Sequence, residues 1–219
     1  MKPNPNSQEA KNAISVAQMR ESDAYTIANF VESKELMRRA AQGIFDAVAD
    51  TTGWQDKKIA VIAGSGNNGG DGYALAEILA DHGIPAHIFR VSGKFSEDGS
   101  YYYEQAVAKG VPAELFLPES DHAGFTGYDI LVDCILGTGF AGVPRGAAAE
   151  AIRSINASGA YVVSADINSG MNGDTGEAVL AVKSDLTVSI GFYKTGLFQG
   201  RAPELIGELV NTDIGIVRK

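Results

Sequence analysis

The stretch Lys57-Lys58-Ile59-Ala60-Val61-Ile62-Ala63 leads directly into Gly64-Ser65-Gly66-Asn67-Asn68-Gly69-Gly70-Asp71. A short apolar run that ends in glycines is typical of a strand buried on both faces of a parallel sheet. The glycines have the G-x-G-x-x-G spacing of a phosphate-binding turn between a strand and a helix. Because glycine lacks a Cβ, backbone amides can approach a phosphate closely there. The spacing alone also fits a purely structural turn, but a nucleotide site is the interpretation that the neighbouring residues favour.

Two details narrow the kind of nucleotide site. The turn has no Lys-Ser or Lys-Thr pair, so it is not a Walker-type phosphate loop. The second strand, expected at residues 86–91, ends in Arg90-Val91 rather than in the acid that binds a ribose hydroxyl in NAD dehydrogenases. A conventional nucleotide oxidoreductase is therefore disfavoured. Asn67, Asn68 and Asp71 add more polar side chains than a simple turn needs.

Outside this turn, the sequence alternates between strand-like and helix-like segments. Such alternation predicts βαβ units, and hence an α/β Rossmann-like three-layer αβα sandwich with a mostly parallel sheet. Two helices are expected to lead the first strand, and residues 1–6 read as a frayed tail. We expect a single domain over residues 1–219. Helices are expected at residues 14–30, 33–49, 72–82, 100–109 and 146–158, and strands at 57–63, 86–91, 114–117, 129–136, 161–165, 185–190 and, as an edge strand, 208–213.

Bulk composition limits the class of protein. The 219 residues include 45% hydrophobic and 21% charged side chains, as in an ordinary globular domain. A formal net charge of −9 argues against nucleic-acid binding. One cysteine leaves no intrachain disulfide, and neither a signal peptide nor an apolar run of roughly 20 residues for a membrane span is evident. We therefore expect a cytoplasmic protein that binds no membrane.

Acidic residues mark the ends of two expected strands. Asp133 lies within Val132-Asp133-Cys134, and Asp166 follows the strand at residues 161–165. A single such aspartate can be a cap on the next turn. Two of them on parallel strands share one edge of the sheet with the glycine turn, which is where open α/β sheets bind ligands. Together, Asn68, Asp133 and Ser169 would offer only oxygen ligands, which suit a hard cation. Lys194 follows the next strand and is either a solvated surface group or a fourth member of this edge.

Three linked motifs now identify a family. In their order and internal spacing they closely resemble the NAD(P)H-hydrate epimerases, also known as the YjeF N-terminal domain, and the resemblance extends from about residue 19 to the C-terminus. The two leading helices also agree with that family. The motifs are Gly66-Asn67-Asn68-Gly69-Gly70-Asp71-Gly72, then Val132-Asp133 with residues 137–146 (GTGFAGVPRG), and Asp166-Ile167-Asn168-Ser169-Gly170 with residues 173–176 (GDTG).

The resemblance implies an isomerase in nicotinamide nucleotide repair. Its substrate is hydrated NADH or NADPH, which carries a hydroxyl on carbon 6 of the nicotinamide ring, and the enzyme interconverts the R and S forms. Such enzymes are usually homodimers, and a separate ADP- or ATP-dependent dehydratase then restores the cofactor. This activity makes the nucleotide the substrate and not a cofactor of the enzyme.

The resemblance also implies roles for particular residues. Asp166 would contact the substrate, and Lys194 falls in the family's Lys-x-Gly-Leu segment, which favours a functional role. A potassium ion (K+) would be bound by Asn68, Asp133 and Ser169. The substrate's phosphates and ribose would be held by Asn67, Asn68, Gly69, Gly70 and Asp71 and by Gly137, Thr138, Gly139, Phe140, Ala141, Gly142 and Val143.

The chemistry suggests a catalytic pair. Assisted loss of the carbon-6 hydroxyl leaves an iminium ion stabilised by the ring nitrogen, and water returning to the opposite face inverts the centre. One group must then act as acid for the leaving hydroxyl and as base for the incoming water. Our hypothesis is that Asp166 does this, while Lys194 tunes its charge or protonates the leaving oxygen.

The sequence departs from the family pattern at several positions. Asn168 replaces a proline, Met171-Asn172 replaces Leu-Asp, and Arg38 replaces a glutamate in the leading helix. Losing the proline frees the backbone φ beside Ser169. An alternative interpretation is therefore a catalytically altered scaffold or interaction module of the same fold. Retention of Asn68, Asp133, Asp166, Ser169 and Lys194 argues against it.

Overall fold

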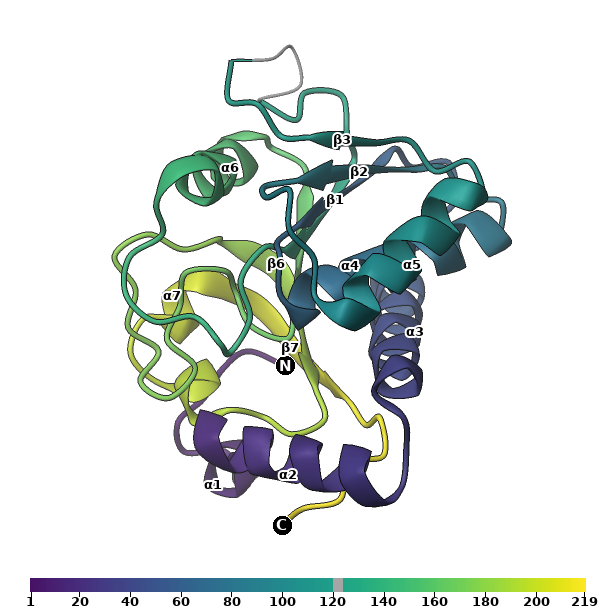
Figure 1. Ribbon diagram of the computed structural model, residues 1–219. Coiled ribbons are helices and arrows are strands. Elements are labelled where there is room, and N and C mark those ends of the chain that lie inside the picture. The colour runs from purple at the N-terminus through teal and green to yellow at the C-terminus, as the bar shows by residue number, and fades with distance from the viewer. Residues whose placement is uncertain (120–123) are drawn as a thin grey trace.

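The computed structural model describes residues 1–119 and 124–219. Within these ranges seven strands form one sheet, in which all neighbouring strands are parallel and the order is β3-β2-β1-β4-β5-β6-β7 (Figure 1). The α/β class and the edge position of the last strand are confirmed. The strand bounds are β1 (Ile59–Ala63), β2 (Ala86–Arg90), β3 (Ala113–Leu115), β4 (Ile130–Cys134), β5 (Tyr161–Ala165), β6 (Ser184–Ile190) and β7 (Ile206–Thr212).

Helices cover both faces of the sheet, which gives the expected three layers (Figure 1). On one face pack α3 (Ser33–Thr51), α4 (Asn67–Asp81) and α5 (Glu97–Ala108), and on the other packs α6 (Gly146–Ala157). β1 explains this division because its side chains alternate, with Val61 facing the first group and Ile62 facing α6. A smaller core forms around β7, η1 (Thr195–Phe198) and α7 (Ala202–Leu205).

The strand order reverses at β1, which pairs with β2 on one side and β4 on the other. Chain connections leave this point in opposite directions, so a crevice opens outside the carboxyl ends of the two strands. The glycine turn follows β1, and residues 135–145 follow β4. The fold therefore places two of the three motifs at the switch point.

The start of α4 differs from the sequence expectation. The helix begins at Asn67, not at residue 72, so the motif's two central glycines lie inside its first turn. Glycine has low helix propensity, but close packing requires it here. A Cβ on Gly69 would collide with the carbonyl of Gly64, and one on Gly70 would lie 2.7 Å from the sulfur of Met37. Tertiary contacts therefore override local propensity.

The N-terminal segment also differs from the expected frayed tail. The amino group of Met1 donates to the carbonyl of Leu209 at 2.9 Å, and the Leu209 N–H donates back to Met1 at 2.6 Å. This exchange pairs the chain start with the edge strand β7. The short helix α1 (Gln8–Asn12) follows and then α2 (Val16–Asn29), so the two expected leading helices are preceded by one further turn of helix.

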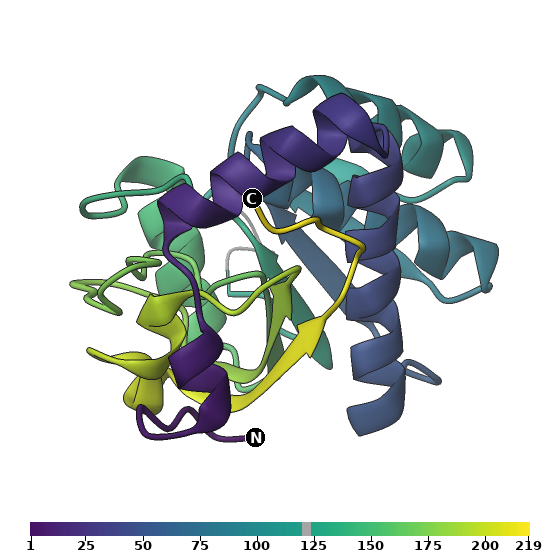
Figure 2. The same cartoon turned by 90° about the horizontal axis from the view of Figure 1, so that it is seen from below.

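Hydrogen bonds connect α2 to the C-terminal segment. Its buried Ser22 and Thr26 hydroxyls accept from the backbone N–H groups of Lys219 and Val217, at 3.1 and 2.9 Å. Figure 2 shows the C-terminal segment running between α2 and α3. At the other end of α2, the backbone of Ile14 forms a parallel bridge with Lys194. Both ends of the chain thus fix α2 across one side of the sheet.

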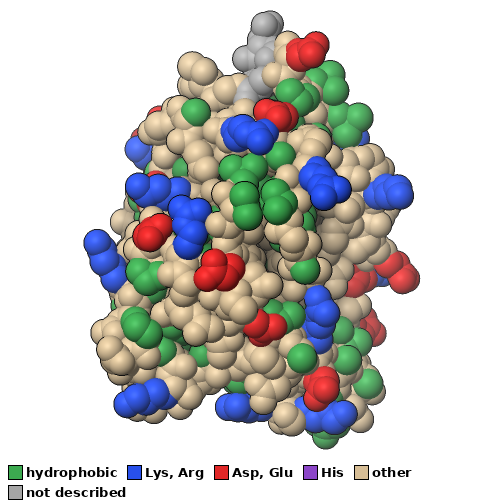
Figure 3. Space-filling model, turned by 90° about the vertical axis from the view of Figure 1, so that its left-hand side faces the viewer, with side chains coloured by type: hydrophobic (Ala, Val, Ile, Leu, Met, Phe, Trp, Pro, Cys, Tyr) green, Lys and Arg blue, Asp and Glu red, His purple; other side chains and the backbone are tan. Residues whose placement is uncertain are grey.

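The surface carries both signs of charge. On the face seen in Figure 3, acidic and basic side chains are interspersed with hydrophobic ones. Among the described residues, no helix has both the length and the apolar character that crossing a membrane requires.

Candidate active site

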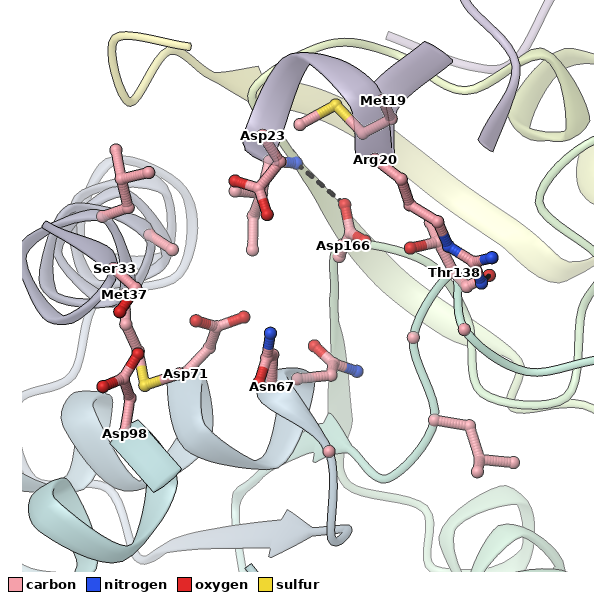
Figure 4. Close-up of a pocket in the computed structure, with 18 of the residues that line it drawn as sticks. Met19, Arg20, Asp23, Ser33, Met37, Asn67, Asp71, Asp98, Thr138 and Asp166 are labelled. Atoms are coloured by element: carbon pink, nitrogen blue, oxygen red, sulfur yellow. Dashed lines mark hydrogen bonds between the residues drawn. The ribbon is translucent and has the colours of Figure 1, made fainter. Parts of the chain in front are cut away.

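A cavity of about 660 Å³ opens at the carboxyl ends of β1 and β4. Its walls come from α2, α3, the first turns of α4 and α5, the segment after β4, and the ends of β5 and β6 (Figure 4). This volume suits a small-molecule or cofactor site. The sequence-predicted residues that line it are Asn67, Asn68, Asp71, Gly137, Thr138, Gly139, Phe140, Asp166 and Lys194.

Other sequence-predicted residues lie outside the cavity wall. Gly69 and Gly70 are buried in the first turn of α4, where they permit close packing. Ala141, Gly142 and Val143 continue beyond the lined segment, and Val143 is exposed. Asp133 and Ser169 are fully buried and bonded to each other. The structure therefore brings together the two catalytic candidates and part of each binding motif.

The first turn of α4 faces the cavity with free donors. The N–H groups of Asn67, Asn68 and Gly69 have no carbonyl earlier in the helix to bond, and the N-cap residue Gly66 contributes no side chain. A Cβ built on Gly66 would meet no described atom within 4 Å, so packing does not require this glycine. Its missing side chain leaves open the approach to the helix N-terminus, where phosphates bind well.

The side chain of Asn68 is left without hydrogen bonds. Its amide nitrogen and oxygen are both buried, and neither has a partner among the described residues. An unpaired buried amide costs roughly 1–3 kcal/mol. Such an arrangement is expected where a ligand completes the bonding. Gly137 packs directly against this residue, because a Cβ there would lie 3.1 Å from the Cβ of Asn68.

Asp133 forms the centre of a buried polar cluster. Its Oδ1 accepts from the Ser169 hydroxyl at 2.5 Å and from the Ile135 N–H at 3.2 Å. Its Oδ2 accepts from the Ser164 hydroxyl and the Ser169 N–H, both at 2.9 Å. Burial raises the pKa of the Asp133 carboxyl, and these hydrogen bonds act in the opposite direction. All four acceptor positions of the carboxylate are thus occupied by uncharged donors.

Asp166 and Lys194 form an ion pair in the cavity wall. The Lys194 side chain is 1% exposed, and its Nζ donates to the Asp166 carboxylate and, at 2.7 Å, to the carbonyl of Ile190. The Asp166 side chain is 15% exposed, so the lysine lies behind it and the carboxylate faces the cavity. This is the pairing that buried charges require.

The backbone of Asp166 adopts an uncommon conformation. Its φ is 65°, and the N–H of Ile167 donates to the carbonyl of Ala165 at 2.7 Å, which closes a three-residue turn around it. Such turns with positive φ are rare and strained. Strain of this kind concentrates at functional sites. The turn directs the carboxylate away from the strand and toward the cavity.

Sequence reasoning missed the contribution of α2. Met19, Asp23 and Ile27 stand at i, i+4 and i+8 on that helix and line the cavity together with Arg20. Arg20 donates to the carbonyl of Thr138 at 3.2 Å. The signal that could have found Asp23 is its helical spacing, which puts an acid in line with two apolar residues.

The acidic side chains in the cavity influence one another. Burial raises the pKa of Asp71 well above its ordinary value, and the charges of Asp166 and then Asp23 act in the same direction, while Lys194 opposes them. Burial and then the charge of Asp166 also raise the pKa of Asp23. Figure 4 shows the three carboxylates approaching the cavity from α2, α4 and the end of β5.

The departures from the family pattern lie outside the cavity wall. The buried amide of Asn168 donates to the carbonyl of Val182 and the hydroxyl of Ser184, both at 3.0 Å, and accepts from Thr187 at 2.7 Å. Met171 is buried, and Asn172 accepts from the N–H groups of residues 174 and 175. Arg38 lies 3.8 Å from Glu77. These substitutions therefore act on local packing and bonding.

Comparison with known proteins places this geometry in context. Residues 33–196 match the family model described as YjeF-related protein N-terminus. A protein of Limosilactobacillus fermentum named NAD(P)H-hydrate epimerase is 36% identical over 211 residues, covering 92% of this chain and 96% of the relative. A protein of Oenococcus oeni with the same name is 34% identical over 207 residues, covering 93% and 96%.

Two further relatives extend the comparison. A bifunctional NAD(P)H-hydrate repair enzyme of Archaeoglobus fulgidus is 37% identical over 181 residues, which cover 83% of this chain and 37% of that enzyme. The crystal structure of the yeast protein ynu0 (YNL200c) superposes with a TM-score of 0.76 and 22% identity, over 90% of this chain and 87% of the yeast chain. The yeast structure shows the same fold.

Proposed function

The chain belongs to the YjeF-related N-terminal family, and we propose that it is an NAD(P)H-hydrate epimerase, an isomerase that interconverts the R and S forms of hydrated NADH and NADPH. The observation that carries this proposal is the composition of the cavity. A helix N-terminus suited to phosphate and a carboxylate–lysine pair suited to proton transfer face the same space.

The nucleotide binds across the switch point. Its phosphates lie against the first turn of α4, where Gly66 leaves room, and against the segment Gly137–Phe140. Arg20 is the cation of α2 that borders this part of the cavity. Backbone donors and this arginine offset the acidic side chains around them. The nicotinamide end then reaches the deeper wall, where Asp166 and Lys194 lie.

Asp166 transfers a proton to or from the oxygen atom on carbon 6. In the ion pair its carboxylate is held at a fixed position by Lys194, and the strained turn directs it into the cavity. It assists cleavage of the carbon–oxygen bond to the leaving hydroxyl, and the ring nitrogen stabilises the resulting iminium ion.

A potassium ion completes the site beside Asn68. The donors there are all oxygens, and the unpaired amide of Asn68 supplies a free acceptor. The Ser169 hydroxyl keeps one lone pair after accepting from Leu136 and donating to Asp133. Asp133 must exchange a present bond to become a direct ligand; otherwise it contributes its charge through Ser169. When bound, the ion supplies positive charge near the phosphates.

Two partners belong to the same proposal. A separate ADP- or ATP-dependent dehydratase consumes the product, and two copies of this chain associate as a homodimer. The Archaeoglobus fulgidus relative supports the first, because its name describes a bifunctional repair enzyme. Static light scattering of the purified protein tests the second.

The decisive experiment follows epimerisation of purified R and S hydrates by the wild type and by Asp166→Asn. The variant should lose about 100-fold or more of the rate, which is the usual contribution of a general acid–base group. Asp98→Asn, at another acid of the cavity wall, is the matched control. A folded Asp166→Asn enzyme with a near wild-type rate would remove Asp166 from this role.

A second measurement addresses the ion and the scaffold alternative. The hydrates should raise the melting temperature of the wild type, and potassium should strengthen their binding more than sodium does. Asn68→Ala should abolish the potassium effect without lowering stability, because it removes unpaired buried atoms. If the protein shows no turnover and the hydrates do not raise its melting temperature, a scaffold is favoured over an enzyme.

A further inference from the structure

The cavity contains more carboxylates than the reaction described above uses. Asp71 reaches it from α4, Asp23 from α2 and Asp98 from the start of α5, in addition to Asp166. The cations lining it, among the described residues, are Arg20, which donates to a backbone carbonyl, and Lys194, which pairs with Asp166. Figure 4 shows Asp71 and Asp166 on different walls with open space between them.

The two carboxyl groups differ in environment. Asp166 is bonded to the ammonium group of Lys194, whereas no described cation is within bonding distance of Asp71. Burial and the neighbouring charges of Asp166 and Asp23 raise the pKa of Asp71 well above its ordinary value. One carboxyl thus has a cation beside it, whereas the other has none and its burial favours the protonated form. Pairs of titratable groups separated in this way commonly divide the roles of base and acid.

Inversion through a planar intermediate makes demands on both faces of the ring. The hydroxyl leaves from one face of carbon 6, and water must add to the other face. A general acid or base acts only within about 2.6–3.2 Å of the oxygen that it serves. A single carboxyl on one face would therefore return water to that same face and regenerate the starting epimer, so Asp166 alone, as the sequence-based hypothesis has it, does not suffice. Efficient epimerisation needs a proton-transfer group on each side.

We propose that Asp71 is the second catalytic acid–base group, acting on the ring face opposite to Asp166. This inference rests on the proposed epimerase function. In one direction the Asp71 carboxyl gives its proton to the leaving hydroxyl as the carbon–oxygen bond breaks, and water departs. A water molecule on the other face then bonds to carbon 6 and loses a proton to Asp166. This turnover leaves Asp71 ionised and Asp166 protonated, and proton exchange with solvent water restores the starting state before the next one. In the reverse direction the two residues exchange roles, so atoms and charge balance.

Asp23 adds a further negative charge to this arrangement. Its charge is among the causes that raise the pKa of Asp71, and it extends from α2 on the opposite side of the cavity (Figure 4). Asp98 has no such part and serves as the control acid.

The test measures oxygen exchange as well as inversion. Each purified epimer is incubated with enzyme in water labelled with a heavy oxygen isotope, and both label uptake and interconversion are followed above the enzyme-free rate. The wild type should couple the two in both directions. Asp71→Asn should lose about 100-fold or more of the interconversion rate but still exchange label into one epimer. Asp166→Asn should exchange label into the other epimer only, and Asp98→Asn should behave as the wild type.

Other outcomes separate the two levels of inference. A wild-type enzyme that leaves both epimers unchanged contradicts the proposed function itself. If the wild type is active, interconversion by Asp71→Asn near the wild-type rate overturns the role of Asp71. The role of Asp71 is also overturned if Asp71→Asn and Asp166→Asn incorporate label into the same epimer, or if both variants fail to incorporate label. Asp71→Asn is nearly isosteric and replaces a buried ionisable group by a neutral one, so thermal unfolding should verify its fold at an equal or higher melting temperature.

Discussion

Two groups of buried acids lie near the same edge of the sheet, and they differ in how their oxygens are satisfied. Around Asp133, four uncharged donors occupy all acceptor positions of one carboxylate. Around Asp166, four carboxylates, its own included, share one cavity with Lys194, and the amide of Asn68 is unpaired. The first group is complete within the protein, whereas the second is complete only with a ligand.

This difference separates stability from function. A fully bonded polar cluster holds β4, β5 and the segment at Ser169 in one arrangement, and its loss should unfold the protein. An incompletely bonded cluster is destabilising in the free protein, and its groups are available for binding and proton transfer. Substitutions around Asp133 should therefore change the free energy of unfolding, whereas substitutions around Asp166 should change the rate of epimerisation.

The largest effect is expected at Lys194. Lys194→Met leaves Asp166 without its cation and should lower the epimerisation rate by about 100- to 10,000-fold. Steady-state kinetics with each epimer measures the loss, and Lys58→Met, at an exposed lysine, is the control. A wild-type rate in Lys194→Met would mean that catalysis by the acids around Asp166 does not depend on the Asp166–Lys194 ion pair.

The Asp133 cluster should respond in stability. Asp133→Ala leaves the donors of Ser164 and Ser169 unpaired in the core and should lower the free energy of unfolding by about 3–5 kcal/mol. Urea denaturation measures the change. Asp129→Ala removes an acceptor that bonds one backbone N–H and should cost only about 1 kcal/mol. Equal losses of unfolding free energy in Asp133→Ala and Asp129→Ala would contradict the view that the Asp133 cluster stabilises the core.

Two glycines of one motif provide a matched pair. Gly64→Ala would drive a Cβ into the carbonyl of Ile135 and should destabilise the fold by about 1–3 kcal/mol. Gly66→Ala meets no described atom and should leave unfolding nearly unchanged. If phosphate approaches there, Gly66→Ala should raise KM about tenfold. Thermal unfolding of both variants tests the stability prediction, and steady-state kinetics tests the KM prediction. An unchanged KM in Gly66→Ala would contradict the proposal that phosphate binds beside Gly66.

The smallest effect concerns the pH dependence of stability. Because the folded-state pKa of Asp71 lies above its ordinary value of 3.8, the folded protein binds this proton more tightly than the unfolded chain does. Wild-type stability therefore falls as pH rises from about 4 toward the raised pKa. Asp71→Asn should remove that loss and be the more stable protein at neutral pH. A stability difference that is absent, or that shrinks as pH rises, would contradict the raised pKa.

Much of the fold follows from local sequence patterns. The apolar runs at β1 and β4 end in glycines or an acid, and the structure has strands where these patterns predict them. Helix α3 follows its apolar stripe within two residues of the expected end. The start of α4 was wrong by five residues, because close packing of Gly69 and Gly70 outweighs their low helix propensity. The N-terminal tail was wrong because its bonding partner, Leu209, lies at the far end of the chain.

The candidate site divides in the same way. The motifs after β1, β4 and β5 identify Asn68, Asp133, Asp166 and Ser169, because residues at the ends of parallel strands must share one edge of the sheet. The sequence could not predict which of these side chains are fully hydrogen-bonded, because the donors that bond a carboxylate come from segments distant along the chain. Asp23 went unnoticed because α2 lies far from the motifs along the chain.

The sequence by itself determined the strand–helix alternation, the phosphate-binding turn and the family, because these depend on short-range periodicity and spacing. Only the tertiary structure decided which buried acids are bonded and which are free. It set the donors around Asp133 and left Asp71 near two other carboxylates. The physical reason is that desolvation and Coulomb interactions depend on distances between groups that folding alone brings together.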